Sequence, residues 1–222
     1  MTYKFDFGAL LPYWQQLLYG CWLTIVLATL AIAIGLIIGI VTALAKQSRI
    51  GAINFIATSY VELIRNTPFL VQVFFIYFGL PALGVALQPW SAAVLALSIN
   101  CGAFAAEVIR GGIDGIARGQ YEAGAALGLK PFQVFRYIVL KPAMRIVFPA
   151  LSGQFILSLL TTSIVSSISA EELTSIAQSL DTLTFRSFEI YIVATLLYLS
   201  MSMIFATIFK AVDRIYFSYP LK

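Results

Sequence analysis

Five long apolar runs constrain this chain more than any other feature of its sequence. Each run reaches the roughly 20 residues that a helix needs to cross a hydrocarbon core about 30 Å thick. A mean hydropathy of +0.92 and a charged fraction of 11% leave too few polar residues to cover such runs in water. The strands of a membrane β-barrel would be shorter and would alternate in polarity. We therefore predict an all-α membrane protein with five transmembrane helices, at residues 17–45, 53–78, 90–109, 148–168 and 190–209.

The basic residues gather on one side of these five spans. With the N-terminus placed outside, the outer segments hold only Lys4 and Arg186, and Arg65 falls inside a span. Because cytoplasmic segments carry the excess of Lys and Arg, we predict a multi-pass protein with its N-terminus outside and its C-terminus in the cytoplasm. The inner residues are Lys46, Arg49, Arg110, Arg118, Lys130, Arg136, Lys141, Arg145, Lys210, Arg214 and Lys222.

The residue inventory excludes most enzymes and cofactor-binding proteins. The chain has no histidine, and Cys21 and Cys101 both fall in predicted spans, so we expect no metal site and no catalytic group. No G-x-x-x-x-G-K-[ST] motif occurs, so the chain lacks that device for holding a nucleotide. The positive charge is explained by cytoplasmic loops beside anionic lipid and requires no nucleic acid. Without repeats or compositional boundaries, residues 1–222 are predicted to form a single transmembrane domain.

The connection between the third and fourth spans, residues 110–147, is long and carries six basic residues. Within it, the stretch QYEAGAALGLKP begins with helix-forming residues, Gly128 is placed to cap a helix, and Pro131 prevents its continuation. We therefore predict a short cytoplasmic helix at residues 120–127. Its small side chains would let the backbone lie deep in a partner's groove or tuck under its own bundle, and composition leaves both alternatives open.

Three motifs carry a resemblance to a known family. They are YVELIRNTPFLVQVFFIYFGLP from Tyr60, AEVIRGGIDGIARGQYEAGAALG from Ala106, and the "EAA" pattern from Glu122 to Gly128 followed by residues 138–142. With these motifs, the chain resembles the permease subunits of bacterial ABC importers, in particular their polar amino-acid subfamily, over nearly its whole length. Two positions depart from the family pattern: residues 140–143 read LKPA instead of LPQA, and Gly124 replaces the second alanine of the triplet.

The resemblance implies a type I ABC importer permease fold, with the cytoplasmic helix as a coupling helix that docks on an ATPase. It implies an ABC ATPase homodimer that binds ATP and Mg²⁺, a second permease copy or a paralogous permease, and a periplasmic or lipid-anchored solute-binding protein. The chain itself would be a transport subunit of the bacterial inner membrane without a cofactor and without ATPase activity, and its substrate a polar amino acid. The coupling residues implied are Arg118, Gln120, Glu122, Ala123, Gly124 and Gly128.

Two other transport functions remain open. One is an ABC importer permease for another small solute. The other is an ion-coupled secondary transporter subunit, although such proteins usually show internal repeats and more spans than this chain has.

Charged residues occur near the centre of the second span, where a charge costs on the order of 2.5–3.5 kcal/mol. Glu62 and Arg65 are three residues apart, so they share a helical face and could pair. Pro68 removes a helical hydrogen bond and can open the turn that holds Asn66 and Thr67, as in the interrupted helices that line transport sites. We predict that Arg65 binds a substrate carboxylate beside Asn66 and Thr67. The alternative is that Arg65 only neutralises Glu62 and nearby carbonyls.

The fourth span carries a polar stripe on an arc of roughly 100°. Such a stripe could line a solute pathway, or its hydroxyls could bond to their own helix or to a neighbouring one. We predict that the stripe contributes to the substrate site. Its members are Gln154, Ser158, Thr161 and Thr162, with Ser163 adjacent.

Two residues of the third span complete the polar inventory. Asn100, near the centre, is a further candidate for substrate contact, whereas Glu107, near the cytoplasmic end, is expected to be structural. Family members often carry a lysine and then an acid or amide in the fourth span, where this chain reads LTTSI from Leu160. The missing acid favours a neutral or acidic amino acid over a cationic one.

Two further features concern packing. Ala31, Gly35, Gly39 and Ala43 recur at intervals of four and predict a small-residue face on the first helix, for close packing within the subunit or across a dimer. The outer segment 171–189 is acidic on balance and is expected to be an exposed loop, with contact to a solute-binding protein as the alternative.

Overall fold

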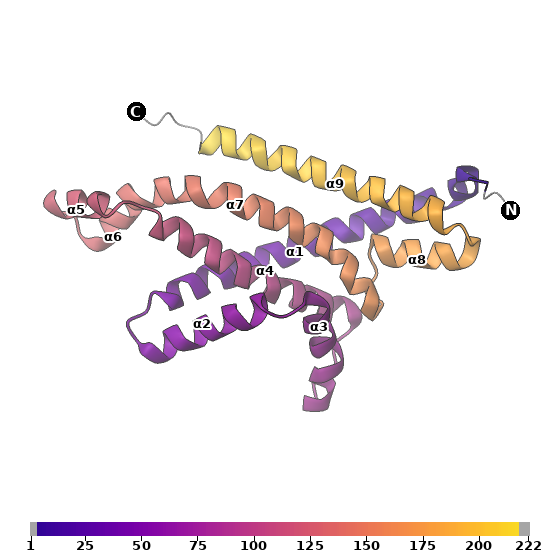
Figure 1. The fold of residues 1–222 in the computed structure, drawn as a ribbon, viewed down its shortest axis with the longest axis horizontal. Coiled ribbons are helices and arrows are strands. Elements are labelled where there is room, and N and C mark those ends of the chain that lie inside the picture. Colours follow the sequence, from indigo (N-terminus) through magenta and orange to yellow (C-terminus); the bar gives the residue numbers. More distant parts are fainter. Residues whose placement is uncertain (1–3, 218–222) are drawn as a thin grey trace.

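The structure, a computed structural model, describes residues 4–217. Residues 1–3 and 218–222 lie outside the described part, including Lys222 of the orientation argument and both ends of the predicted domain. Within residues 4–217 the regular elements are all helical, as predicted (Figure 1). The 3₁₀-helices are η1 (Phe7–Tyr13), η3 (Leu80–Leu83) and η5 (Thr162–Ile168), and the π-helices are η2 (Phe75–Gly79) and η4 (Phe135–Val139). The α-helices are α1 (Trp14–Lys46), α2 (Gly51–Arg65), α3 (Phe69–Phe74), α4 (Pro89–Asp114), α5 (Arg118–Ala126), α6 (Pro131–Val134), α7 (Leu140–Thr161), α8 (Leu173–Thr184) and α9 (Ser187–Tyr216).

Four helical segments are long and apolar enough to cross a membrane, and they contain four of the five predicted spans. The opening predicted at Pro68 within the span 53–78 is confirmed as a full break, since α2 ends at Arg65 and the next segment leaves it at 112°. Pro68 explains the break, since it lacks a backbone N–H and disfavours a helical conformation of the residue before it. Counting the bent pair as one span gives up to five spans. The four segments are Phe7–Lys46, Pro89–Asp114, Pro131–Ile168 and Ser187–Tyr216.

The connection between the third and fourth spans is shorter than the predicted 110–147. α4 continues to Asp114, and helical structure resumes at Pro131 and runs without interruption into α7. The short helix predicted at 120–127 is confirmed as α5, which begins two residues earlier and ends one residue earlier than predicted. Gly128 follows it with a φ of 73°, the left-handed conformation in which glycine meets no Cβ penalty.

Small residues let α1 and α4 pack closely. A Cβ atom added at Gly39 would lie 2.7 Å from the Cβ of Ala105, and one added at Gly35 would lie 2.8 Å from the Cβ of Cys101. The two alanines of the same face of α1 are fully buried. The predicted small-residue face is therefore confirmed, and its partner is α4 of the same subunit.

The outer segment 171–189 is not the exposed loop that we expected. Most of it forms α8, which packs against α1 and α9. Leu173 and Leu180 lie on one face of α8 and are fully buried, so burial of this apolar face holds the helix against the bundle. Glu172 caps the helix by accepting a hydrogen bond from the Ser175 N–H at 2.8 Å, and it accepts another from the hydroxyl of Tyr198 on α9.

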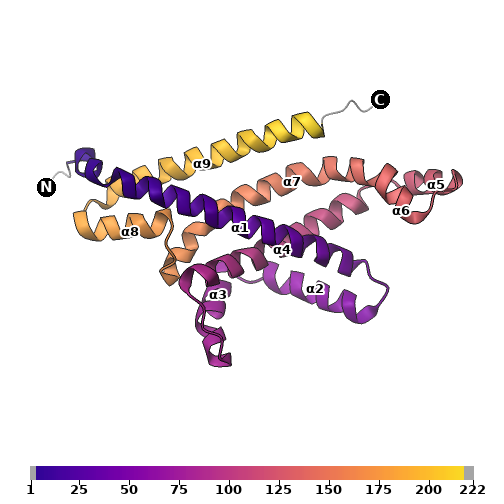
Figure 2. The same cartoon turned by 180° about the vertical axis from the view of Figure 1, so that it is seen from behind.

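The long helices α1, α4, α7 and α9 run roughly along the long axis of the molecule, while the segment beginning with α3 projects to one side (Figures 1 and 2). α5 and the turn between α1 and α2 lie at one end of the molecule, and η1 and α8 lie at the other (Figure 1). The elements at the α5 end carry most of the basic residues. The predicted inner segments, which hold most of the Lys and Arg residues, thus lie together at one end of the bundle.

Candidate functional site

The break between α2 and α3 leaves backbone carbonyls that polar side chains satisfy. The side-chain amide of Asn66 donates to the carbonyl of Glu62 at 2.8 Å, and the hydroxyl of Thr67 donates to the carbonyl four residues before it at 2.9 Å. The side-chain amide of Gln72 donates to the carbonyl of Ile64 at 2.7 Å. Because the last carbonyls of a helix have no partner within it, these three side chains stabilise a helix end inside the membrane. Asn66 and Thr67, both predicted substrate contacts, are exposed at this break.

Gln72 is a site residue that the sequence reasoning missed. It is buried, it donates a second hydrogen bond to the Thr67 carbonyl at 3.0 Å, and its side-chain oxygen accepts one from Asn100 of α4 at 3.0 Å. The predicted contact Asn100 is half-buried and connects α4 to the break through Gln72. The sequence feature that could have identified Gln72 is its position as a single glutamine in an apolar run, one turn after Pro68.

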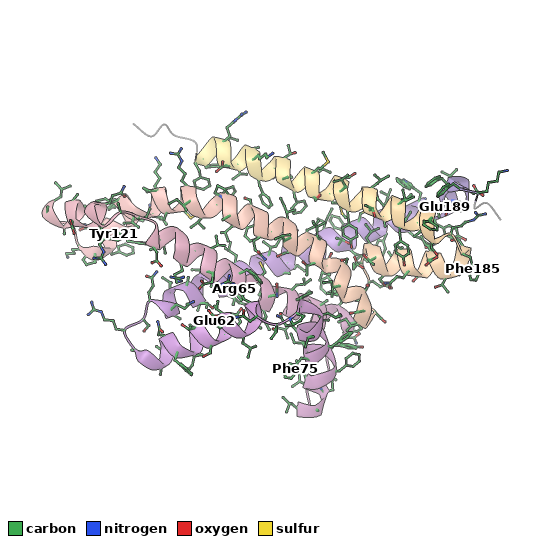
Figure 3. All side chains as sticks on the ribbon, viewed as in Figure 1. Glu62, Arg65, Phe75, Tyr121, Phe185 and Glu189 are labelled. Carbon is green, nitrogen blue, oxygen red and sulfur yellow. The ribbon has the colours of Figure 1, made fainter. Side chains whose placement is uncertain are left out.

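Arg65 pairs with Glu107 of α4 and not with Glu62, the partner named in the alternative to a substrate carboxylate. The Nη1 atom of Arg65 lies 3.5 Å from a carboxylate oxygen of Glu107, and its guanidinium carbon lies 5.5 Å from the ring centre of Phe104. The carboxylate of Glu62 instead accepts a hydrogen bond from Asn66 at 3.0 Å. Tertiary packing explains this choice of partner, because α4 packs against α2 and presents the carboxylate of Glu107 to the last turn of α2. Glu62 and Arg65 both lie in that turn (Figure 3).

Glu107 has the structural role that we expected. It also binds Lys46 at the end of α1 and, at 3.2 Å, Arg110, which in turn binds Asp114 at 2.7 Å. The contact with Arg65 is the longest of its three ion pairs, and 39% of the Arg65 side chain is exposed. Since a guanidinium has five N–H donors, Arg65 can bind a second carboxylate while it stays beside Glu107.

The polar stripe predicted on the fourth span is divided between two environments. Ser158 and Thr162 are buried, whereas Gln154, Thr161 and Ser163 are partly exposed. The hydroxyls of Thr161, Thr162 and Ser163 donate to carbonyls of their own helix at 2.7–2.8 Å. α7 ends at Thr161 and continues as the tighter 3₁₀-helix η5, which packs against α3 just after the break. The stripe is therefore not one continuous surface, because the helix changes its winding in the middle of it.

α5 presents one face outward at the end of the molecule and one face inward (Figure 3). Gly124 is buried, and a Cβ atom added there would lie 2.8 Å from Ile138 and 2.9 Å from Val134, so this glycine allows α5 to approach its own chain. The inner face tucks under the bundle, as one alternative predicted, and the outer face is exposed, so docking of a partner there stays a prediction. The exposed members of the predicted coupling set are Arg118, Gln120, Glu122, Ala123 and Gly128.

Comparison with known proteins gives consistent results in sequence and structure. A family model described as "Binding-protein-dependent transport system inner membrane component" matches residues 31–216. The glutamine transport system permease protein GlnP of Escherichia coli (strain K12) is 36% identical over 213 residues, which cover 95% of this chain and 97% of that protein. The L-cystine transport system permease protein TcyB of Bacillus subtilis (strain 168) is 34% identical over 203 residues, covering 91% and 87% respectively.

Two solved structures share the fold. One, an amino acid ABC transporter with histidines, has a chain that is 37% identical, with a TM-score of 0.91 and coverage of 96% of this chain and 99% of that chain. The other, the MetNI methionine ABC transporter in an inward-facing conformation, is 21% identical with a TM-score of 0.67, covers 91% of this chain and 98% of that chain, and supports the fold alone. The predicted type I ABC importer permease fold is confirmed, and the apolar helices fit the inner-membrane location in the family description. This chain belongs to the family of inner membrane components of binding-protein-dependent transport systems.

Proposed function

We propose that this chain is the permease subunit of an ATP-driven importer that carries a polar amino acid across the bacterial inner membrane. The observation that carries the proposal is the partly exposed guanidinium of Arg65 at a break in a membrane helix. Every amino acid has a carboxylate, and a guanidinium binds a carboxylate with two parallel hydrogen bonds. The names of the relatives, which concern glutamine, cystine and arginine transport, support this substrate class.

The proposed substrate site is built around Arg65 from both sides of the break. Asn66, Thr67 and Asn100 would contribute from α2 and α4. From the α7 side, Gln154, Thr161 and Ser163 would contribute directly, whereas the buried Ser158 and Thr162 would support them from inside the bundle.

We propose a neutral or acidic amino acid as the substrate. The polar side chains proposed from α7 and η5 are amides and hydroxyls, which offer no negative charge to a cationic side chain. The similarity to a glutamine permease supports this choice. Tight uptake of arginine, the substrate in the name of another relative, would contradict it.

The test is Arg65→Ala in the complete transporter reconstituted in vesicles. We expect the affinity for substrate to fall roughly 10–100-fold, the range that corresponds to losing a charged hydrogen bond of about 1.5–3 kcal/mol. Arg49→Ala, which removes a cation from the turn between α1 and α2, is the matched control and should leave affinity unchanged. Unchanged substrate affinity in an assembled Arg65→Ala transporter would contradict the proposal. The role of Arg65 would then be limited to its ion pair with Glu107.

We further propose that an ABC ATPase homodimer, which binds ATP and Mg²⁺, docks on the exposed face of α5. Ala123→Cys should then form a cross-link to the ATPase, whereas Leu183→Cys on α8, at the other end of the molecule, should not. The native Cys21 and Cys101 are buried, so we expect little background cross-linking from them. Cross-linking from both positions or from neither would contradict docking of the ATPase on α5. Substrate uptake without the ATPase would favour an ion-coupled transporter.

The remaining partners follow from the same arrangement. We propose that the N-terminus and α8 face the periplasm, where a periplasmic or lipid-anchored solute-binding protein delivers the substrate. The α5 end and the C-terminus would face the cytoplasm. A second permease, identical or paralogous, would complete the pathway, and this chain would hold no cofactor of its own.

A further inference from the structure

A groove between α7 and α9 lies outside the proposed substrate and coupling sites. It encloses about 250 Å³, and its walls include Gly153 and Ile156 of α7 and Ala206 and Phe209 of α9. Lys210 also lines this groove, together with a second hollow of about 610 Å³ along α9 that Arg214 lines as well. The two hollows therefore form a surface with an apolar part and a basic end.

The basic end lies at the depth of lipid headgroups. On α9, residues 190–209 carry no charge, and 20 helical residues rise about 30 Å, the thickness of the hydrocarbon core. Lys210 is the first charged residue after this stretch, so it reaches the membrane interface at the α5 end of the molecule. The walls formed by Ile156 and Ala206 then lie within the hydrocarbon region.

The charge that α9 contributes at this interface is positive. Lys210 and Arg214 are exposed and one helical turn apart, and neither belongs to an ion pair among residues 4–217. Asp213, which lines both hollows, is the one carboxylate between them. On α7, Arg145 stands one turn before Pro149 and two turns before Gly153, on the face that leads into the groove.

We propose that this groove binds an anionic phospholipid. Lys210 and Arg214 bind the phosphate group, and an acyl chain lies along the apolar walls past Gly153. A Cβ atom added at Gly153 would meet no atom within 4 Å, so the groove is open where the chain passes. Two unpaired cations beside one carboxylate favour a headgroup with net negative charge over a zwitterionic one.

The charge test compares lipid retention by the purified full-length chain in detergent. We expect native mass spectrometry to detect more retained phosphatidylglycerol than phosphatidylcholine. Lys210→Ala and Arg214→Ala should each lower phosphatidylglycerol retention roughly fivefold. This factor corresponds to the attraction of about 1 kcal/mol between one basic side chain and an anionic lipid surface. Asp213→Asn should raise it, which a misfolded variant would not do. Arg49→Ala, at the same membrane face, is the matched control.

The steric test fills the apolar part of the groove. Gly153→Leu should lower phosphatidylglycerol retention, while Gly111→Leu, at another open position on α4, should not. Equal retention of phosphatidylglycerol and phosphatidylcholine would overturn the proposal, as would equal loss in the Arg49 and Lys210 variants. Retention unaffected by Gly153→Leu would also overturn it, because the acyl chain would then lie elsewhere.

Discussion

Glu107 gathers cations from three separate parts of the chain. Lys46 comes from the end of α1, Arg65 from the last turn of α2, and Arg110 from the same helix as Glu107. A charge within a membrane span is costly unless it is paired, so this carboxylate makes it possible to hold Arg65 at the break. The same contacts connect α1, α2 and α4.

Glu107→Gln should destabilise the protein by about 2 kcal/mol, because three cations lose their common carboxylate and partly buried charges without a partner are costly. Chemical denaturation of the purified chain would measure this loss. Asp114→Asn is the control, since it removes a carboxylate that is 57% exposed and forms an ion pair with Arg110; its effect should be about 0–0.5 kcal/mol. Equal effects of the two changes would mean that Glu107 does not organise this network.

Glu172 should make stability depend on pH. Burial raises the pKa of its carboxyl above the ordinary value of 4.5, in spite of hydrogen bonds from Tyr198 and Ser175 that act in the opposite direction. The folded chain then holds the proton more tightly than the unfolded chain does. The resulting stabilisation is complete below pH 4.5 and is lost as the pH rises through the raised pKa.

We therefore expect the melting temperature of the wild type to fall from pH 4.5 upward more steeply than that of Glu172→Gln. Glu171→Gln changes the neighbouring exposed residue and should keep the wild-type profile. Thermal unfolding at a series of pH values would measure the difference. Parallel profiles for the wild type and Glu172→Gln would show that another group is responsible.

At the scale of elements, the contact between α1 and α4 depends on the absence of side chains. Gly39→Ala would place a methyl group 2.7 Å from Ala105, so the helices must separate, and we expect a loss of about 1–3 kcal/mol. The same change at Gly111, where an added Cβ meets nothing, should be neutral or should stabilise by about 0.5–1 kcal/mol. Comparing unfolding free energies tests this, and a neutral Gly39→Ala would mean that the contact is looser than the structure describes.

At the scale of the whole molecule, the separation of basic residues predicts which end faces the cytoplasm. Leu127 after α5 is 75% exposed and Phe185 after α8 is 84% exposed, at opposite ends of the bundle. Phe185→Cys should react with a membrane-impermeant maleimide in intact cells whose outer membrane admits it. Leu127→Cys should react only after the inner membrane is opened. The reverse pattern would place the N-terminus in the cytoplasm.

Much of this fold could be predicted because a bilayer makes strict demands on a chain. Apolar runs of spanning length predicted four of the helices, and in the structure each of these helical segments extends beyond one or both of the predicted ends. The break at Pro68 could be foreseen from the missing N–H, but its angle could not. The angle depends on Gln72 and Asn100, which meet only when α3 packs beside α4.

The partner of a residue was less predictable than its placement. Local spacing suggested that Arg65 would bind Glu62, but Glu107, 42 positions further along the chain, binds it instead. Likewise, the spacing of small residues on α1 indicated close packing but not with which helix, and the acidic outer segment gave no sign that Glu172 would be buried.

The order of polar and apolar residues along this chain was enough to establish a helical membrane protein, four of its spans, its family resemblance and a short helix between the third and fourth spans. Those features depend on transfer from water to lipid and on local hydrogen bonding, which each segment experiences separately. The folded bundle alone decided which carboxylate holds Arg65, which face of α5 stays exposed, and which cations gather at the groove of α7 and α9. These depend on residues far apart in sequence, whose proximity is set by how the helices pack.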